Sequence, residues 1–326
     1  MADEYICCRS ADRNWTAAKI GNRLTGELPD AKASTANVVG FAASERTGMM
    51  LTHHGSTLAV RTLVSRDVPA ALELSTDAGW NQTAEDWRTL LKLAPDTCFA
   101  IETGNVLAAT ATLVLYGKKL AWLGMVLTRA GYRGRGYARR LVQRALEAAD
   151  EREVGSVKLD ATAQGAQLYR KVGFRVEQNV ERWTGYGLPA AGPEVSQHRM
   201  TLAQIQNIDR EIQCANRSEL IHLLAARSQT ISTEAGFAMH RPGIRARYLG
   251  PCAAASEQAA VQLIRTCLAA DTGMWFWDLL PANTAATAIA KEFGFRVDRH
   301  LVRMIRGADL PGEADRVFGI AGFEIG

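Results

Sequence analysis

The chain contains no apolar run long enough to cross a membrane and no segment typical of a secretion signal. Its longest apolar run, residues 106–116, is interrupted by threonines and falls well short of the roughly 20 residues that a membrane-spanning helix needs. Acidic residues at positions 3, 4 and 12 break up the start of the chain, which has no continuous apolar core. We therefore expect neither a membrane-bound nor a secreted protein.

Cysteine and net charge are also low. The six cysteines show neither the spacing of a metal site nor the density of a small disulfide-bonded domain. We therefore expect a cytoplasmic protein with no bound metal. The formal net charge is only +4, so charge alone indicates neither a nucleic acid nor an acidic substrate as partner. With 326 residues, 47% of them hydrophobic, the chain can fill more than one domain core.

Two well-known phosphate-binding motifs are absent from the glycine-rich segment 131–138. A dinucleotide fingerprint that starts at Gly134 needs a glycine where the chain has Arg139. A Walker loop that ends at Gly136 needs a lysine where the chain has Tyr137. The segment is therefore neither of these two loops.

The same segment nevertheless has the composition of an anion-binding turn. It lies between an apolar stretch at 120–127 and an amphipathic stretch that ends near Asp150. Glycines let the backbone curl and approach a ligand, so that several N–H groups can point at one anion at the start of the following helix. The alternative interpretation is an arginine-rich surface turn. The residues predicted to hold a pyrophosphate are Arg133, Gly134, Arg135, Gly136, Tyr137, Ala138 and Arg139.

The pattern R-x-x-G-x-A, formed by Arg133, Gly136 and Ala138, resembles the phosphate loop of the GNAT superfamily of acyl-CoA-dependent N-acetyltransferases. A second segment, residues 164–174, is similar to the short helix of that family that carries a tyrosine, here Tyr169, and ends at Gly-Phe. The resemblance implies an α/β (α+β) fold, in tandem, with a central mixed, mostly antiparallel sheet flanked by helices in each half.

Local signals in residues 57–186 predict the element order that this fold requires. Ser65 and Thr83 are suitable N-caps for two helices, and Asp86 completes a capping box with Thr83. Gly104 and Gly117 mark turns between strands. The predicted strands and helices follow the order strand, two helices, three strands, helix, strand, helix, strand.

The second half of the chain contains a degenerate copy of the first. Residues 168–177 align with residues 289–298, and Arg182 then aligns with Arg303. The positions opposite the loop arginines and glycines are residues 254–257, with the sequence Ala-Ala-Ser-Glu, and alanine replaces the tyrosine. We therefore expect the second half to keep the scaffold without the cofactor site.

These observations divide the chain into five segments. Residues 1–56 have no sustained periodicity, which predicts a weakly ordered extension with the native start at Met49 or Met50. Residues 57–186 form the predicted catalytic GNAT domain, 187–198 a linker, 199–308 a degenerate GNAT-like domain and 309–326 a tail. Resemblance to tandem GNAT proteins implies that the second domain closes part of the substrate site.

The resemblance also assigns roles to single residues. The backbone N–H groups of Val126, Leu127 and Thr128 are the expected donors to the pantetheine arm and the thioester oxygen. Tyr169 matches the usual general acid of the family, and its alternative role is aromatic packing. Asp160 is a possible general base, with Glu102 or a chain of water molecules as alternatives.

The resemblance also implies that Trp80, Asn81 and Gln82, between the first two helices, line the acceptor side. The alternative for this tripeptide is a capped interhelical turn with Trp80 in the core. No histidine has a credible catalytic partner in the sequence.

Three functions follow from the sequence. The first is an N-acetyltransferase that moves an acetyl group from acetyl-CoA to a primary amine of a small molecule or a protein. The second is a non-catalytic sensor of acyl-CoA. The third is a nucleic-acid-binding protein, which would rest on the arginines at positions 133, 135, 139, 140 and 144. The expected assembly is a monomer or a homodimer.

Overall fold

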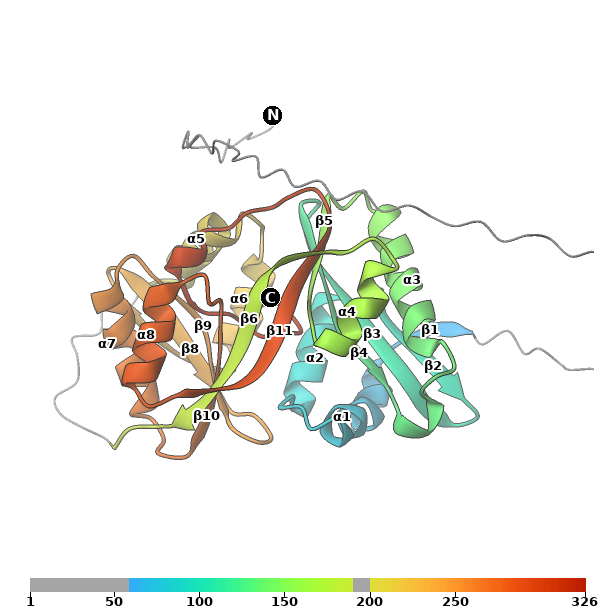
Figure 1. The fold of residues 1–326 in the computed structure, drawn as a ribbon, viewed down its shortest axis with the longest axis horizontal. Coiled ribbons are helices and arrows are strands. Elements are labelled where there is room, and N and C mark those ends of the chain that lie inside the picture. Colours follow the sequence, from blue (N-terminus) through green and yellow to red (C-terminus); the bar gives the residue numbers. More distant parts are fainter. Residues whose placement is uncertain (1–58, 190–199) are drawn as a thin grey trace, which may run out of the picture. The chain divides into compact units, whose positions relative to one another are not determined.

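The computed structural model describes residues 59–189 and 200–326. The predicted extension 1–56 and most of the predicted linker 187–198 lie outside these residues. Within them, two successive sets of strands and helices contribute to one 12-stranded sheet (Figure 1). The predicted fold class, a mixed and mostly antiparallel sheet with helices, is confirmed. In the described part of the chain, no helix is long and apolar enough to cross a membrane.

We call residues 59–186 the first repeat and residues 200–326 the second repeat. The first repeat consists of β1 (Val60–Thr62), η1 (Ser65–Asp67), α1 (Val68–Asp77), α2 (Ala84–Leu93), β2 (Cys98–Thr103), β3 (Val106–Tyr116), β4 (Leu120–Thr128), η2 (Ala130–Tyr132), α3 (Tyr137–Asp150), β5 (Ser156–Ala161), α4 (Ala163–Arg170) and β6 (Arg175–Tyr186). The predicted order of elements is confirmed.

From its first helix onward, the second repeat follows the same order of helices and strands, and it adds a final short strand. It consists of α5 (Leu202–Gln213), α6 (Ser218–Ala225), β7 (Gln229–Thr233), β8 (Gly236–Arg241), β9 (Arg247–Ala254), α7 (Glu257–Leu268), β10 (Met274–Leu279), α8 (Thr284–Glu292), β11 (Arg296–Gly307), η3 (Ala314–Arg316) and β12 (Val317–Gly319). Strands β9 and β10 thus correspond to β4 and β5, and β11 corresponds to β6.

Local chemistry explains where several elements begin and end. The predicted capping box of α2 is present, because Thr83 Oγ1 accepts from the N–H of Asp86 while the Asp86 carboxylate accepts from the N–H of Thr83. Gly173 follows α4 with a φ of 94°, a backbone angle that favours glycine. These features confirm the predicted start of α2 and end of α4. The predicted N-cap Ser65 is wrong, because Ser65 is the first residue of η1 and Asp67 stands at the N-cap of α1.

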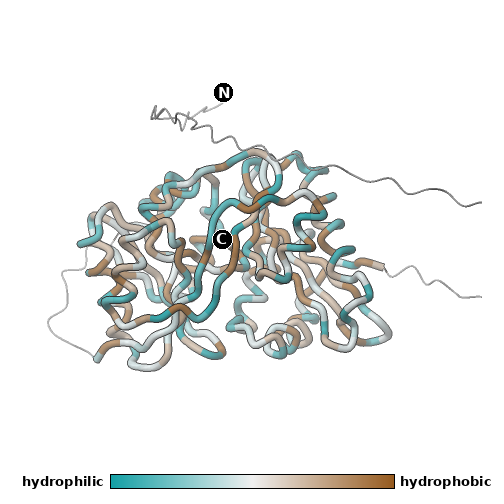
Figure 2. The backbone as a smooth tube through the Cα atoms, viewed as in Figure 1, coloured by the Kyte–Doolittle hydropathy of each residue, from teal (hydrophilic) through white to brown (hydrophobic). Residues whose placement is uncertain are grey.

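The last strand of each repeat is exchanged between the two halves of the sheet. The strand order is β1-β2-β3-β4-β5-β11-β6-β10-β9-β8-β7, so β11 pairs with β5 and β6 pairs with β10. Figure 1 shows these two strands crossing between the halves. Figure 2 shows that they carry many hydrophilic residues. The two repeats therefore share one sheet and do not build separate ones.

Two matching ion pairs hold the exchanged strands in place. Arg182 of β6 donates two hydrogen bonds, of 2.8 and 2.7 Å, to Asp278 of β10. Arg303 of β11 donates two hydrogen bonds of 2.9 Å to Asp160 of β5. All four side chains are nearly fully buried. Each arginine thus neutralises an aspartate of the other repeat. Replacing only one partner of such a pair would leave a buried charge uncompensated and so lower the stability of the fold.

The hydrophobic core also joins the two repeats. One cluster contains side chains of α1 and α2 together with α5, α6 and the last residues of the chain. Two further clusters lie on the other face of the sheet, one under α3 and α4 and the other under α7 and α8. Each of these two clusters also contains a residue of the exchanged strand, Met304 of β11 in the first and Trp183 of β6 in the second. Apolar burial thus links the two repeats on both faces of the sheet.

Candidate active site

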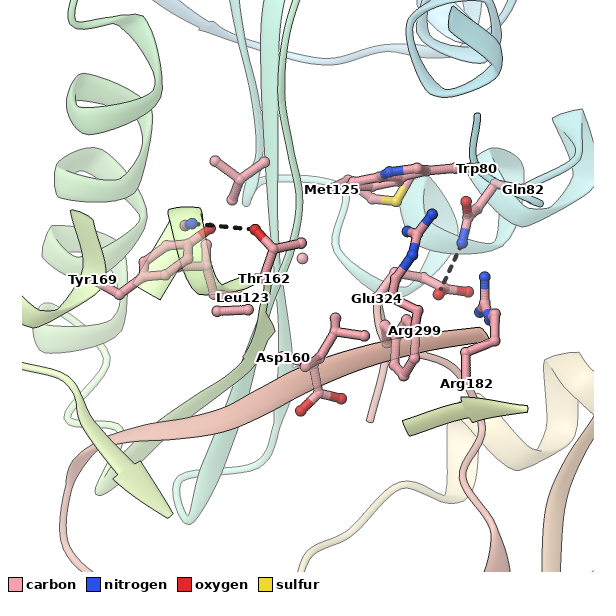
Figure 3. A pocket seen from close by; sticks show the side chains of 16 residues that line it. Trp80, Gln82, Leu123, Met125, Asp160, Thr162, Tyr169, Arg182, Arg299 and Glu324 are labelled. Carbon is pink, nitrogen blue, oxygen red and sulfur yellow. Dashed lines mark hydrogen bonds between the residues drawn. The ribbon is translucent and has the colours of Figure 1, made fainter. Parts of the chain in front are cut away.

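A gap opens in the first repeat where two parallel strands diverge. Strand β4 pairs with β5 over only three residues, ending at Trp122 opposite Lys158. Beyond that point a cavity of about 150 Å³ lies between the strands (Figure 3). Side chains of both repeats line it: Trp80, Gln82, Leu123, Met125, Val126, Asp160, Thr162, Tyr169, Arg182, Arg299, Leu301, Phe323 and Glu324.

The backbone N–H groups of β4 point alternately toward β3 and toward this gap. The N–H of Arg129 donates to Ala108 of β3, and Leu127 stands opposite Thr110 in the same register. Hydrogen-bonded and non-hydrogen-bonded positions alternate in an antiparallel pair, so the N–H of Leu127 also faces β3. The N–H groups of Val126 and Thr128 then face the gap. Of the three predicted backbone donors, two point toward the gap and one toward β3.

The glycine-rich turn has the geometry of an anion cradle. Gly134 and Gly136 have φ angles of 76° and 79°, and a Cβ at either position would meet no atom within 4 Å. Gly136 is the N-cap of α3, whose first turn contains no acidic residue. Four exposed arginines of this turn have no carboxylate partner in the described part of the chain: Arg133, Arg135, Arg139 and Arg140. Positive charge and free N–H groups thus meet at one helix start.

Two further residues of the predicted loop point elsewhere. The Tyr137 side chain is buried in the core beneath α3 and lies 3.5 Å from the hydroxyl of Thr103. Ala138 is half-buried one position later. These two residues place the helix on the sheet, so only their backbone N–H groups are positioned for an anion. Arg144, one turn further along, forms ion pairs with Glu147 and Glu151.

Tyr169 lies at one end of the cavity. It projects from α4, packs edge-to-face on Phe174 with ring centroids 5.8 Å apart, and is 9% exposed. Its hydroxyl has no hydrogen-bond partner within residues 59–189 and 200–326. Burial raises the pKa of Tyr169 above its ordinary value, so the phenol keeps its proton at neutral pH. The ring therefore packs and the hydroxyl faces the cavity.

Neither predicted base has a free carboxylate. Asp160 accepts both hydrogen bonds of the Arg303 guanidinium and is completely buried. Its counterpart in the second repeat, Asp278, is paired in the same way, although the loop and the tyrosine are missing there. Glu102 forms an ion pair of 2.8 Å with Arg61 and does not line the cavity.

The three residues 80–82, between α1 and α2, do not all face the cavity. Trp80 and Gln82 line the cavity. Asn81 turns away and binds the 243–246 loop of the second repeat, where its Oδ1 accepts from the N–H groups of Arg245 and Ala246 at 2.8 and 3.0 Å. Two of the three residues predicted for the acceptor side therefore reach the cavity, and the third joins the repeats.

Sequence reasoning missed three charged residues that line the cavity: Arg182, Arg299 and Glu324. Figure 3 shows them gathered with Gln82 at the end opposite Tyr169. Arg182 is committed to Asp278, whereas Glu324 accepts a hydrogen bond of 3.0 Å from Gln82. A signal for Glu324 was present, since it is the only charged residue in the otherwise apolar segment 317–326.

The last residues of the chain bring Glu324 to this position. Trp122 of β4 donates to the carbonyl of Phe323 at 2.9 Å, and Tyr116 of β3 donates to the carbonyl of Ile325 at 2.6 Å. A Cβ on Gly124 would lie 2.4 Å from the carbonyl oxygen of Glu324. The close approach of the two backbones therefore requires glycine at that position of β4.

The equivalent gap in the second repeat is filled. Strands β9 and β10 also pair in parallel over three residues, ending at Leu249 opposite Trp277. Beyond that point β12 pairs with β9, with Val317 opposite Ala253. Trp277 donates to the carbonyl of Phe318 at 2.7 Å. The chain itself thus occupies the position that remains open between β4 and β5.

Comparisons with known proteins agree with this geometry. A holothin acyltransferase from Pseudoalteromonas sp. (strain SANK 73390) is 26% identical over 243 residues, which cover 67% of this chain and 77% of that protein. A structure assigned as an acetyltransferase from Pyrococcus horikoshii has a TM-score of 0.75 at 20% identity and covers 84% of this chain and 100% of its own. A tandem GNAT protein from the clavulanic acid biosynthesis pathway has a TM-score of 0.56 at 14% identity, covering 77% and 99%.

Family matches cover both repeats separately. Residues 65–174 match the acetyltransferase (GNAT) family, and residues 205–319 match an acetyltransferase (GNAT) domain. The first match ends before β6, the strand that crosses into the other half of the sheet. The chain therefore belongs to the GNAT family of acyltransferases, with two GNAT domains in tandem.

Proposed function

We propose that the protein transfers the acetyl group of acetyl-CoA to a primary amine of a small molecule or a protein, in the cavity between β4 and β5. The observation that carries this proposal is the open gap itself. It has unpaired backbone donors of β4 along one wall and a buried phenol at one end, and β4 leads directly into the glycine-rich turn at the start of α3. The second repeat, in which the gap is filled, lacks all three features.

The residues present fit an acyl-CoA. The turn leaves open space around Gly134 and Gly136, and the start of α3 has four exposed arginines that form no ion pair with any described residue. A pyrophosphate would be held there by backbone N–H groups and guanidinium groups. The N–H groups of Val126 and Thr128 would pair with the pantetheine arm as an added strand does. When bound, acetyl-CoA supplies the thioester whose acetyl group is transferred.

Tyr169 is the proposed general acid. In the transfer, the amine nitrogen forms a bond to the acyl carbon while the carbon–sulfur bond breaks and the electron pair stays on sulfur. The Tyr169 hydroxyl would give its proton to that thiolate, and the proton that the acylated nitrogen loses would restore the phenol through solvent. Its raised pKa keeps the proton in place before the transfer, and the packing of its ring on Phe174 fixes the hydroxyl at the cavity wall.

Asp160 has a positioning role in this proposal. Both of its oxygens are occupied by Arg303, and the same arrangement recurs at Asp278 and Arg182 in the half that lacks the site. A carboxylate held in this way is poorly suited to receive a proton from an amine. We therefore assign Asp160 to holding the exchanged strand β11 beside β5.

The test is CoA release by wild type and by Tyr169→Phe with acetyl-CoA and a panel of amines. We expect turnover to fall by about 10²–10⁴-fold in the variant, because that is the usual contribution of a general acid. The dissociation constant for acetyl-CoA should stay nearly unchanged, since the ring remains. Tyr186→Phe is the matched control, because Tyr186 is 66% exposed and does not line the cavity.

Two results would count against this assignment. A folded Tyr169→Phe variant with the wild-type rate would move Tyr169 to a purely structural role. A wild-type protein that binds acetyl-CoA but releases no CoA with any amine would contradict the proposed reaction.

A further inference from the structure

Arg299 is a cation without an anionic partner at the acceptor end of the cavity. It comes from β11, one of the two exchanged strands, and its side chain lines the cavity beside Trp80 and Gln82. Within residues 59–189 and 200–326, its guanidinium forms no hydrogen bond and no ion pair, whereas the neighbouring Arg182 is fully committed to Asp278. The guanidinium of Arg299 is therefore available to an anion that enters the cavity.

The surroundings of Arg299 leave its charge uncompensated. Burial and the nearby Arg182 guanidinium lower the pKa of Arg299, and the carboxylates of Asp298 and Asp278 only partly offset this. A lowered pKa means that the protein around the group disfavours its positive charge. An anionic ligand would relieve that cost, and a planar guanidinium is suited to a carboxylate through two parallel hydrogen bonds.

The same end of the cavity offers a site for an amino group. Gln82 donates from Nε2 to Glu324, but its Oε1 is buried and has no hydrogen-bond partner in the described residues. Glu324 lines the cavity, and its one ion pair within the described residues is a long one, with Arg241 Nη2 4.0 Å from its Oε1. An unpaired amide oxygen beside a carboxylate is a suitable environment for the N–H groups of an amine.

We propose that the acceptor is a primary amine that also carries an anionic group, with its amino group at Glu324 and Gln82 and its anionic group at Arg299. This inference rests on the proposed function and adds the substrate class. Glu324 would take the proton that an ammonium must lose before its nitrogen can attack, and Gln82 Oε1 would accept a remaining N–H. Arg299 would hold the anion and so orient the amine.

The charges around Glu324 agree with a proton acceptor. Burial and the Asp86 carboxylate raise the pKa of Glu324, and the Arg241 and Arg182 guanidiniums act in the opposite direction. The net effect is a pKa above the ordinary value of a glutamate, which brings it closer to neutral pH and makes the carboxylate a better base. A methyl group on Gly322 would lie within 2.8 Å of both carboxylate oxygens, so glycine at 322 leaves the space that the Glu324 carboxylate occupies.

The experiment compares matched acceptors that differ in one carboxylate. Phenylalanine is paired with phenethylamine, and 4-aminobutyrate with butylamine, and CoA release from acetyl-CoA is measured for each. Wild type should favour the carboxylate-bearing member in kcat/KM. Arg299→Gln should remove about 10- to 100-fold of that preference, mainly through KM, because charge-assisted hydrogen bonds are lost.

Three variants distinguish the proposed anion site at Arg299 from the proposed amino-group site at Glu324. Arg299→Lys should restore part of the preference, since it keeps the charge but loses the planar fork. Arg296→Gln is the matched control, because Arg296 is exposed on the same strand and does not line the cavity. Glu324→Gln should lower kcat for both members of each pair by about 10²–10⁴-fold and remove the acidic limb of the pH–rate profile.

The possible outcomes distinguish a wrong acceptor class from a wrong proposed function. Equal kcat/KM for the two members of each pair, or an equal effect of Arg299→Gln on both, would overturn the inference while turnover upholds acyl transfer to amines. A Glu324→Gln variant with the wild-type kcat and pH profile would contradict the proposal that Glu324 takes the proton of the acceptor's ammonium group. No CoA release with any amine in wild type would overturn the proposed function, and this inference with it.

Discussion

The two repeats have the same order of helices and strands, yet only one of them has an open gap. In both, two parallel strands pair over three residues and then diverge. In the first repeat the space between β4 and β5 is a cavity, and β4 is followed in the chain by a glycine-rich turn at the start of α3. In the second repeat β12 fills the space beside β9, and α7 begins with Ser256 at its N-cap and Glu257 in its first turn, where α3 has Gly136 at its N-cap and no acidic residue in its first turn. The scaffold is therefore independent of the binding site.

The difference also shows how the second repeat contributes to the first. After β12 fills the second gap, the chain continues to β4 and brings Glu324 into the first gap. Arg299, on the exchanged strand β11, reaches the same cavity. One repeat thus supplies the proposed acyl-CoA site, and the other supplies much of the wall that faces the acceptor. The last ten residues, 317–326, thus both fill the gap of the second repeat and line the cavity of the first.

The largest effect that we expect comes from placing an acidic residue at the start of α3, as the second repeat has at the start of α7. Gly136→Asp should reduce acetyl-CoA affinity by more than about 100-fold, because it places a carboxylate where N–H groups and arginines would meet phosphates. Titration calorimetry with acetyl-CoA measures this change.

Gly117→Asp is the matched control for that variant. Gly117 also has a positive φ, 70°, and open space around it, but it lies in the turn between β3 and β4. The Gly117→Asp variant should bind acetyl-CoA as tightly as wild type does. Unchanged affinity in Gly136→Asp would return the segment to an ordinary surface turn.

A smaller effect is expected from loosening the segment that fills the second gap. Phe318 of β12 is 2% exposed, so Phe318→Ala should lower the free energy of unfolding by about 3–5 kcal/mol. Denaturant unfolding of the full chain measures this loss. The variant should gain no second acetyl-CoA site, because residues 254–257 lack the glycines and arginines of the loop. A second site in this variant would show that β12 alone blocks binding.

Sequence reasoning located the elements because their signals are local. The capping box at Thr83, the turn glycines and the helix that begins after Gly136 all depend on residues within a few positions of each other. The same holds for the position of Tyr169 on a short helix. These features could be predicted without knowing which strands lie side by side.

The strand exchange could not be predicted in the same way. Strands β6 and β11 have similar sequences, and each carries one arginine that pairs with an aspartate in the other repeat, Asp278 or Asp160. Local pattern therefore gives no reason for one pairing over the other. The same limit affected Asp160, whose position near the end of a strand is compatible with a base until its buried partner Arg303 is known. Glu324 was missed because its neighbours in space, Gln82 and Gly124, are distant in sequence.

Calorimetric titration of the full chain with acetyl-CoA tests the central claim most directly. The open gap of the first repeat and the filled gap of the second predict one binding site per chain, and Gly136→Asp should remove it. Two sites per chain, or a single site that survives Gly136→Asp, would contradict the assignment of the acyl-CoA site to the gap between β4 and β5.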